Sequence, residues 1–354
     1  VLGDDVRVCY DTRDGRRVDP EYLDEADFYF KRSYDASYLA TLGEAGRKVR
    51  PLGLNYLVYP DGRDVFSLWR SIRLVPRGKL REIWRSLRLF DSIRFFPFLS
   101  RMEALPDYRA EPKVLFMVDA KDPENALDKS AQGVEQRMYL NDVRAACIKA
   151  LREALGDKFY GGFMHTDFAR RNYNALLMPD SRAASKKNYI SLLRSYPICV
   201  ATTGLHGSIG WKFGEYVAFG KAIVSERLEY EVPGNFRKDV NYLEFASPQE
   251  CVEQALRLME DQDLRVAMMS ANSEYYQMYG RPDSMVLNTI RIALSEAARN
   301  SAASAGRKDA APSFEPGQIQ EKHGETLRAG APGPAMESGD PDSRTVERFL
   351  RKAP

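Results

Sequence analysis

The sequence has few of the residues from which metal and redox centres are built. Its three histidines, His165, His206 and His323, lie far apart and show no metal-site spacing. None of its four cysteines forms a CxxC pair, which argues against a zinc knuckle or a redox dithiol. Scattered thiols are typical of a reducing compartment. We therefore expect a cytoplasmic protein with no bound metal and no cofactor.

Long apolar runs are also missing. No stretch reaches the ~18 apolar residues that would span a bilayer, and no signal peptide opens the chain. The net charge is only +2, and no RNA- or DNA-binding motif is present, so no nucleic-acid partner is expected. The first residue is Val1 rather than Met, and an expected strand follows almost at once. We therefore expect the first domain to be short or to lack an early element.

Short apolar runs alternate with helical patterns along most of the chain. Residues 1–110 hold expected strands at 6–10, 28–30 and 49–54, and a helix over 35–45. After a hinge at Glu111-Pro112, strands are expected at 114–118, 159–160, 198–201 and 222–224, and helices at 136–155 and 187–195. Such alternation is typical of parallel sheets covered by helices. The predicted fold is α/β with two Rossmann-like domains, 1–110 and 111–283, the first shorter than the ~150 residues of a usual domain.

The last part of the chain changes character. Residues 247–250, Ser-Pro-Gln-Glu, form a capping box with Pro at the first helical position and predict a helix. Further helices are expected at 264–279 and 283–299, with 284–299 as a helix that returns to the first domain. Large apolar residues almost vanish between Asn300 and Val346. Residues 300–354 are predicted to be a disordered tail, because they cannot bury enough surface to offset their ordering entropy.

Residues 66–101 are both basic and aromatic. They carry nine Lys or Arg and two acids, a local charge of +7 (nine minus two), with Trp and Phe side chains interleaved. This composition is typical of a segment that binds an anionic membrane surface, or here an anionic acceptor. The alternative is an insertion that packs its aromatic side chains on the first domain and leaves its arginines in water.

The segment 202–226, TTGLHGSIGWKFGEYVAFGKAIVSE, is the most informative about chemistry. An apolar strand ends at Ala201, and a loop with two glycines follows. Ser208 is a natural N-cap for a helix through Phe219, which Gly220 would end. This order of elements places the start of a helix above the carboxyl end of a strand, where open α/β sheets bind nucleotides.

The two faces of this expected helix differ in polarity. Its apolar face consists of Ile209, Phe213, Tyr216 and Val217. Ser208, Lys212 and Glu215 lie within ~60° of each other on another face. The N–H groups at a helix start attract a diphosphate, Lys212 adds a positive charge, and Glu215 can accept hydrogen bonds from a ribose. Alternatively, Glu215 lies on a solvated face or pairs with Lys212 at i,i+3.

Residues 215–224, EYVAFGKAIV, resemble the E-A-x-A-x-G-x-P-V-V segment in the C-terminal domain of GT-B glycosyltransferases. Residues 241–250, NYLEFASPQE, and the pattern MED-x-x-LR at 259–265 are similar to the continuation of that segment. The resemblance covers about residues 111–299 and is most specific at 198–280. It implies a nucleotide-sugar donor as co-substrate, no metal, and a donor site that includes Glu215. The loop and helix pattern adds four further donor-site candidates, Lys212, Ser208, Gly207 and His206.

The resemblance also has a clear departure. In that family the acid that matches Glu215 binds the donor ribose, and the larger retaining branch has another Glu eight residues earlier. Position 207 is glycine here, so the resemblance does not carry a retaining mechanism over. The chain is closer to the divergent bacterial branch described as family-one-like glycosyltransferases. His206 can contact the sugar or phosphate, or only shape the loop.

The acceptor side offers weaker candidates. An inverting enzyme of this type needs a general base in its first domain, and Asp11 and Asp14 follow the first strand. Arg32 follows the next strand, and Arg170 lies after a later one; both are candidates for phosphate or acceptor contacts. All four can instead be turn residues or solvated side chains.

The function that these patterns favour is sugar transfer from a nucleotide sugar to an acceptor such as a glycan or a lipid-linked surface polysaccharide precursor. The protein would be cytoplasmic, and residues 66–101 are candidates for peripheral binding to the inner face of the membrane. The competing hypothesis is a glycosyltransferase-like binding or scaffold protein without catalysis. The glycine at position 207 and the short first domain favour this second hypothesis.

Overall fold

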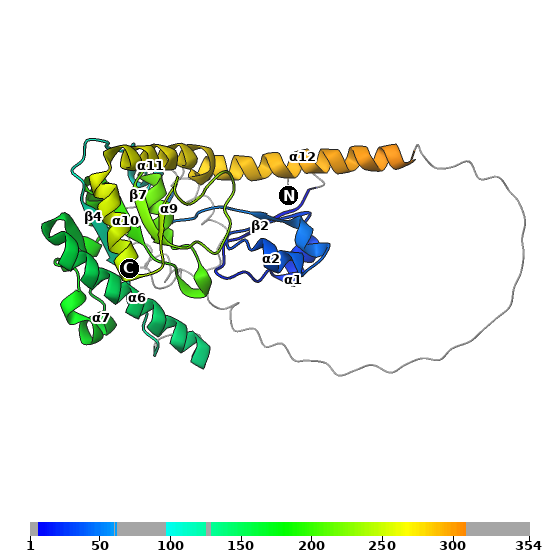
Figure 1. Ribbon diagram of the computed structural model, residues 1–354. Helices are drawn as coiled ribbons and strands as arrows, with labels where there is room; N and C mark the ends of the chain where they lie inside the picture. Colours follow the sequence, from blue (N-terminus) through cyan, green and yellow to red (C-terminus); the bar gives the residue numbers. More distant parts are fainter. Residues whose placement is uncertain (1–5, 60, 62–96, 125–128, 309–354) are drawn as a thin grey trace, which may run out of the picture.

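Two parallel β-sheets, each with its own helices, form the computed structural model (Figure 1). The structure describes residues 6–59, 61, 97–124 and 129–308. Most of the basic aromatic segment 66–101 and the chain from residue 309 lie outside the described residues. The predicted fold class, α/β with two Rossmann-like units, is confirmed.

The first unit is a sheet of three parallel strands in chain order. It contains β1 (Val8–Asp11), β2 (Phe28–Lys31), β3 (Val49–Pro51), α1 (Pro20–Glu25) and α2 (Ala36–Ala40). The central strand β2 is buried along its whole length. The predicted helix over 35–45 was too long, since α2 ends at Ala40 and a separate 3-10 turn covers Ala45–Lys48. Gly43 lies in this break with a φ of +60°, a conformation that ends helices.

The second unit is a five-stranded sheet in which all neighbouring strands are parallel. The strands are β4 (Val114–Val118), β5 (Phe159–Phe163), β6 (Ile198–Ala201), β7 (Ala222–Glu226) and β8 (Leu243–Phe245). Their order is β5-β4-β6-β7-β8, so the direction of winding reverses between β4 and β6. In open α/β sheets, ligands bind at the carboxyl ends of the strands at such a reversal.

Helices cover both faces of the second sheet, which is why its strands are apolar throughout. One face packs against α6 (Ala131–Leu155), α7 (Asp167–Asn172) and α10 (Pro248–Glu260). The other face packs against α8 (Lys186–Ser195) and α9 (Trp211–Ala218). The predicted capping box opens α10, where Ser247 Oγ accepts a hydrogen bond of 3.2 Å from the N–H of Glu250.

The chain leaves the second unit through a long helical segment. The helix α11 (Gln262–Tyr275) runs into a π-turn at Tyr276–Gly280, and α12 (Pro282–Lys308) follows. The sequence predicted that this last helix ends near Arg299 and that disorder begins at residue 300. The helix instead continues to Lys308, because alanines that favour helix are frequent just beyond residue 300.

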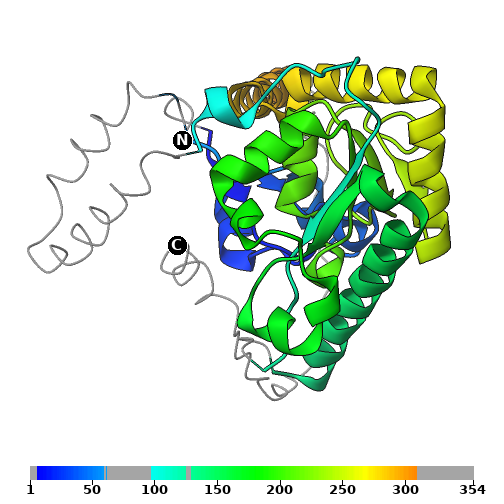
Figure 2. The ribbon, with the colours of Figure 1, turned by 90° about the vertical axis from the view of Figure 1, so that its left-hand side faces the viewer.

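Helix α12 lies along the first unit, and Figures 1 and 2 show this from two directions. Ala293 is fully buried in a cluster with Phe28, Phe30 and Leu52. At its edges, Glu296 forms an ion pair of 2.8 Å with Arg50, and Thr289 forms a hydrogen bond of 2.7 Å with the Tyr10 hydroxyl. The last helix of the chain therefore completes the core of the first sheet.

The chain crosses between the two units twice, and polar contacts join the two crossing segments. Glu103, at the end of the short helix α5 (Leu99–Met102), accepts a hydrogen bond of 3.0 Å from Nε of Arg281. The same carboxylate accepts one of 2.9 Å from the Tyr276 hydroxyl, which lies 2.7 Å from the Tyr56 hydroxyl. This chain of contacts links the first unit, the π-turn and the start of α12.

Candidate functional site

The loop between β6 and α9 has a different conformation from the one that the sequence predicted. Ser208 has an extended backbone and does not cap the helix, and α9 begins only at Trp211 with Gly210 as its N-cap. Glycine is also an accepted N-cap residue, and no side chain satisfies the first N–H groups of α9. The start of this helix is therefore two residues closer to Glu215 than predicted. Gly220, with a φ of +55°, ends the helix region as expected.

Glu215 lies in the middle of α9 and is only 5% exposed. Its Oε1 lies 2.6 Å from Nζ of Lys186, a residue at the start of α8 that the sequence patterns did not single out. The alternative of a solvated Glu215 is therefore wrong, and so is a pair with Lys212 at i,i+3. In the sequence, the position of Lys186 at a helix start was marked only by the serine at 185. This serine caps α8 by accepting a hydrogen bond from the N–H of Asn188.

Lys212 lies beside the same cluster through an aromatic ring. Its Nζ is 4.2 Å from the centre of the Tyr189 ring, and Nζ of Lys186 is 5.3 Å from that centre. Burial lowers the pKa of Lys212, an effect that the negative charge of Glu215 opposes. Burial and the charge of Glu215 also raise the pKa of Tyr189. Two ammonium groups and one carboxylate thus lie around a buried ring and form a net positive cluster that suits a diphosphate.

The first unit reaches this region through Arg32, which follows β2. Its guanidinium is 7% exposed and donates hydrogen bonds to the Asp14 carboxylate and to the carbonyl of Ile209. Ile209 directly precedes the N-cap of α9. Asp14 itself is about half exposed. Arg32 therefore joins the loop after β1 to the start of the helix that carries Glu215, across the contact between the two units.

The loop residues His206 and Gly207 both have a left-handed backbone. Their φ values are 58° and 68°, and such conformations in a residue other than glycine store strain that is often found at functional sites. The Tyr230 hydroxyl holds the loop by a hydrogen bond of 2.5 Å to the carbonyl of His206. A Cβ at Gly15 of the first unit would lie 3.7 Å from Cβ of His206. The strained loop thus faces the first unit.

A carboxylate occupies the space beside Gly207. A Cβ at position 207 would collide with Oε2 of Glu229, so this carboxylate would have to move to admit a larger residue. Glu229 is exposed, and the local sequence gave no reason to select it.

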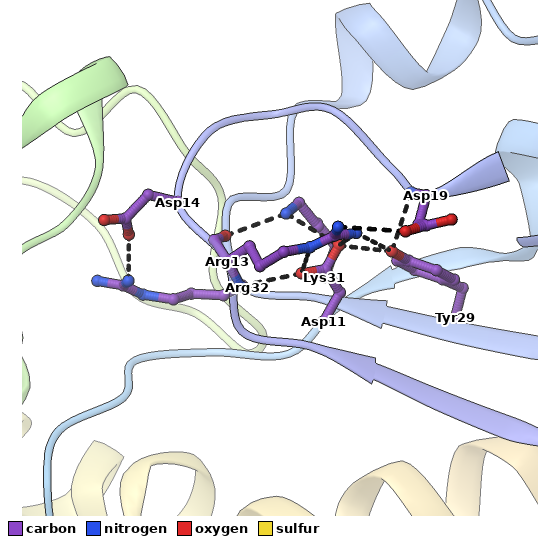
Figure 3. A network of polar contacts seen from close by, with 7 residues as sticks. All are labelled: Asp11, Arg13, Asp14, Asp19, Tyr29, Lys31 and Arg32. Atoms are coloured by element: carbon purple, nitrogen blue, oxygen red, sulfur yellow. Dashed lines mark hydrogen bonds and ion pairs between the residues drawn. The ribbon is translucent and has the colours of Figure 1, made fainter. Parts of the chain in front are cut away.

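Asp11 belongs to a buried network at the carboxyl end of the first sheet, drawn in Figure 3. It accepts hydrogen bonds from the Tyr29 hydroxyl at 2.5 Å and from the guanidinium of Arg13 at 3.0 and 3.1 Å. The fully buried Lys31 lies 3.2 Å from it and also donates to the carbonyl of Arg13. Lys31 and Arg13 thus surround a carboxylate that is 4% exposed.

This network does not suit Asp11 as a general base. Burial alone would raise its pKa, but the hydrogen bonds from Arg13 and Tyr29 and the charge of Lys31 lower the pKa below the usual value. A base with a lowered pKa and no free oxygen is poorly placed to take a proton. Asp14, three residues on, is the more exposed acid and lies at the contact between the units.

Arg170 lies away from this region. It is on α7, which packs on the face of the second sheet opposite to α9, and it pairs with Asp167 at 3.6 Å while remaining exposed. The structure therefore does not bring Arg170 to Glu215. A hollow of about 240 Å³ lined by α8 residues such as Asn188, Ser191 and Ser195 is a separate feature. Within the described residues, no group of His, Cys, Asp and Glu side chains is arranged to hold a metal ion.

A buried arginine that the sequence analysis missed marks the point where the sheet order reverses. Arg144 of α6 donates hydrogen bonds of 2.9 and 3.1 Å to the carbonyls of Asp119 and Thr203 and one of 3.0 Å to Oγ1 of Thr202. It thereby joins the loops that follow β4 and β6. The Thr203 N–H also donates to Glu226 at 2.7 Å, so both loops at the reversal are held in place.

Comparisons with known proteins add a likeness in fold. No protein-family model matches the chain, and no curated protein matches it in sequence. Among solved structures, it is similar to a glycosyltransferase from Rickettsia africae ESF-5 (11% identity, TM-score 0.40, covering 78% of this chain and 67% of that one). It is also similar to HepE from Anabaena in complex with UDP and glucose (11%, TM-score 0.40, 82% and 71%). The C-terminal domain of the group 1 glycosyl transferase LpcC from Francisella tularensis is a third (13%, TM-score 0.34, 50% and 96%).

Among the described elements, the two parallel sheets agree with the GT-B resemblance in the sequence. The identities to these three structures are all below 15%, and the TM-scores are all below 0.5. Activity and ligands must therefore be inferred from its own residues. No helix of the described part has the length and apolarity needed to cross a membrane.

Proposed function

We propose that this protein is a metal-independent glycosyltransferase that moves a sugar from a nucleotide sugar to a hydroxyl acceptor. The observation that carries the proposal is the cluster around Glu215: a buried carboxylate held by Lys186 at 2.6 Å, in a helix that follows β6 at the reversal of the sheet order. Glu215 accepts a hydrogen bond from a ribose hydroxyl. Lys212, Lys186 and the first N–H groups of α9 bind the diphosphate.

The transfer reaction requires mainly that the substrates are correctly positioned and that the charge on the leaving group is stabilised. The bond between the anomeric carbon and the diphosphate oxygen breaks, a bond from the acceptor oxygen to that carbon forms, and the acceptor proton passes to a base. The ammonium groups stabilise the negative charge that develops on the leaving diphosphate. His206, Gly207 and Ser208 line the donor side, and Asp14 is the proposed base on the acceptor side.

The acceptor proposed for this enzyme is a glycan or a lipid-linked polysaccharide precursor, reached from the cytoplasmic side of a membrane. The motivation is the charge and aromatic content of residues 66–101, since each Lys or Arg near an anionic surface contributes about 1 kcal/mol. Sedimentation of the protein with vesicles of neutral lipid and of neutral lipid mixed with anionic lipid tests this. We expect binding to the anionic vesicles only, and equal binding to both would contradict the membrane proposal.

Titration calorimetry with nucleoside diphosphates tests the donor site. Charge-assisted hydrogen bonds to a ribose contribute about 1.5–3 kcal/mol, so Glu215→Ala should weaken binding by roughly 10- to 100-fold. Glu215→Gln keeps one acceptor oxygen and should fall between Ala and wild type. Because Glu215 is buried and paired, its loss should also lower stability, unlike that of a solvated acid.

A matched control separates the ligand effect from the loss of an ion pair. Glu296→Ala breaks a pair of similar length, 2.8 Å to Arg50, far from α9 on the first unit. This variant should bind nucleoside diphosphates as wild type does. If Glu215→Ala also binds them as tightly as wild type, the donor site is wrong. If wild type binds none, the scaffold hypothesis, which the glycine at 207 and the engaged Asp11 favour, becomes the better account.

A further inference from the structure

The contact between the first unit and α9 contains a glycine whose place no other residue can take freely. A Cβ at Gly214 would lie 3.0 Å from the backbone carbonyl oxygen of Asn55 and 3.4 Å from the ring of Tyr56. The chain after β3 therefore lies directly against the helix, one residue from Glu215. Burial raises the pKa of Tyr56 to about 12, and the charges of Glu103 and Glu215 act in the same direction.

At this contact the side-chain oxygen of Asn55 is left without a hydrogen bond. Its Oδ1 is buried and no donor lies within reach among the described residues. More than nine in ten buried polar groups in proteins have a partner, and each exception needs an explanation. A buried amide oxygen without a donor destabilises the state that buries it. The contact between Asn55 and α9 therefore lacks a hydrogen-bond donor for Oδ1 of Asn55.

Two other asparagines show what a structural amide does in this protein. Asn241 and Asn272 are buried and bonded to each other at 3.1 Å. Asn241 also accepts from the N–H of Arg237, and Asn272 donates to the carbonyl of Lys221. The side-chain oxygen of Asn55 has no such partner, although Asn55 lies beside the helix of the proposed donor site.

From these contacts we infer that Asn55 binds a ribose hydroxyl of the nucleotide, as a second acceptor opposite Glu215. The inference rests on the proposed function. Glu215 has one oxygen engaged by Lys186, which leaves one for the ribose, and a ribose presents two neighbouring hydroxyl donors. Asn55 Oδ1 supplies the other acceptor from the first unit. The nucleoside is then held by both units, and its arrival satisfies the unpaired oxygen.

Calorimetric titration and thermal unfolding of Asn55→Ala test this inference. UDP, GDP, ADP and CDP are first titrated into wild type, and the best of them is compared with its 2′-deoxy and 3′-deoxy forms. A neutral hydrogen bond contributes about 0.5–1.5 kcal/mol, so Asn55→Ala should weaken the ribonucleotide about two- to tenfold. It should not weaken further the deoxy form that lacks the hydroxyl in question. The melting temperature should stay the same or rise.

The control is Asn241→Ala, which removes a fully bonded amide and should lower the melting temperature without the selectivity for one hydroxyl. Three results would overturn the inference: unchanged affinity in Asn55→Ala, equal weakening of the ribonucleotide and both deoxy forms, or a fall in melting temperature like that of Asn241→Ala. Failure of wild type to bind any of the four nucleotides overturns the proposed function itself, and the inference with it.

Discussion

At the scale of single residues, Asp11 lies where the sequence predicted a general base, but its contacts do not suit that role. It does follow the first strand and does lie at the carboxyl end of the sheet, as an acceptor-side acid should. Its neighbours decide its chemistry: Lys31 comes from the next strand, and Arg13 bends back from the following turn (Figure 3). Pairing across strands depends on register, which the local pattern does not encode.

The network predicts a particular dependence of stability on pH. Since folding lowers the pKa of Asp11, its contribution is present above the unfolded pKa of about 3.9 and is lost as the pH falls through the lower folded value. Asp11→Asn leaves Lys31 buried and unpaired, so it should cost about 3 kcal/mol at pH 7. The difference from wild type should shrink below about pH 4.

Denaturant unfolding from pH 7 to pH 2 measures this difference. Asp24→Asn, which changes an exposed acid of α1 in the same unit, is the control and should follow the wild-type curve. A constant difference between Asp11→Asn and wild type over the whole range would mean that the charge of Asp11 does not stabilise the fold.

At the scale of elements, the sequence predicted every described strand except β8, but it did not predict the loop conformations. All the expected strands are present, because apolar runs between turn residues identify buried parallel strands. The helix around Glu215 was correctly predicted as a helix. Its predicted start at Ser208, which rested on the preference of serine for N-cap positions, was wrong. The strained turn at His206 and the contact of Arg32 with Ile209, 177 residues apart, fix the real start. Neither leaves a periodic signal in the sequence.

Two serines allow a test of where these helices begin. Ser247 caps α10 and Ser208 does not cap α9, although both were predicted as caps. Ser247→Ala should lower the free energy of unfolding by about 1 kcal/mol, whereas Ser208→Ala removes no helix cap and should lower it by less. Urea titration of both variants gives the comparison. A loss of about 1 kcal/mol in Ser208→Ala would restore the predicted start of α9.

At the scale of the whole molecule, α12 joins the second unit to the core of the first. The sequence predicted a returning helix from its pattern and from the resemblance. It could not show which side chains α12 would bury, because its apolar residues fall on more than one face. Ala293 is fully buried against the first sheet, while the next residue, Leu294, is 48% exposed. The smaller side chain is the one in the core.

Because the small side chain is buried and its larger neighbour is exposed, these two positions give a matched pair of variants. Ala293→Glu places an unpaired carboxylate among Phe28, Phe30 and Leu52 and should destabilise the protein by about 3–5 kcal/mol. Leu294→Glu changes an exposed position and should stay within about 0.5 kcal/mol of wild type. Thermal and urea unfolding of both variants measure the effect. Similar losses in the two variants would show that α12 does not pack on the first sheet as described.

The return of α12 also sets the order in which the protein can fold while it is being made. The strands of the first sheet leave the ribosome early, but Ala293 follows Pro51 only after about 240 residues. At ~5–20 residues per second, this takes roughly 12–50 s. During that time Phe28 and Phe30 lack the helix that covers them, so the nascent chain presents an apolar surface suited to chaperone binding. Completion of the first unit therefore waits until α12 has been synthesised.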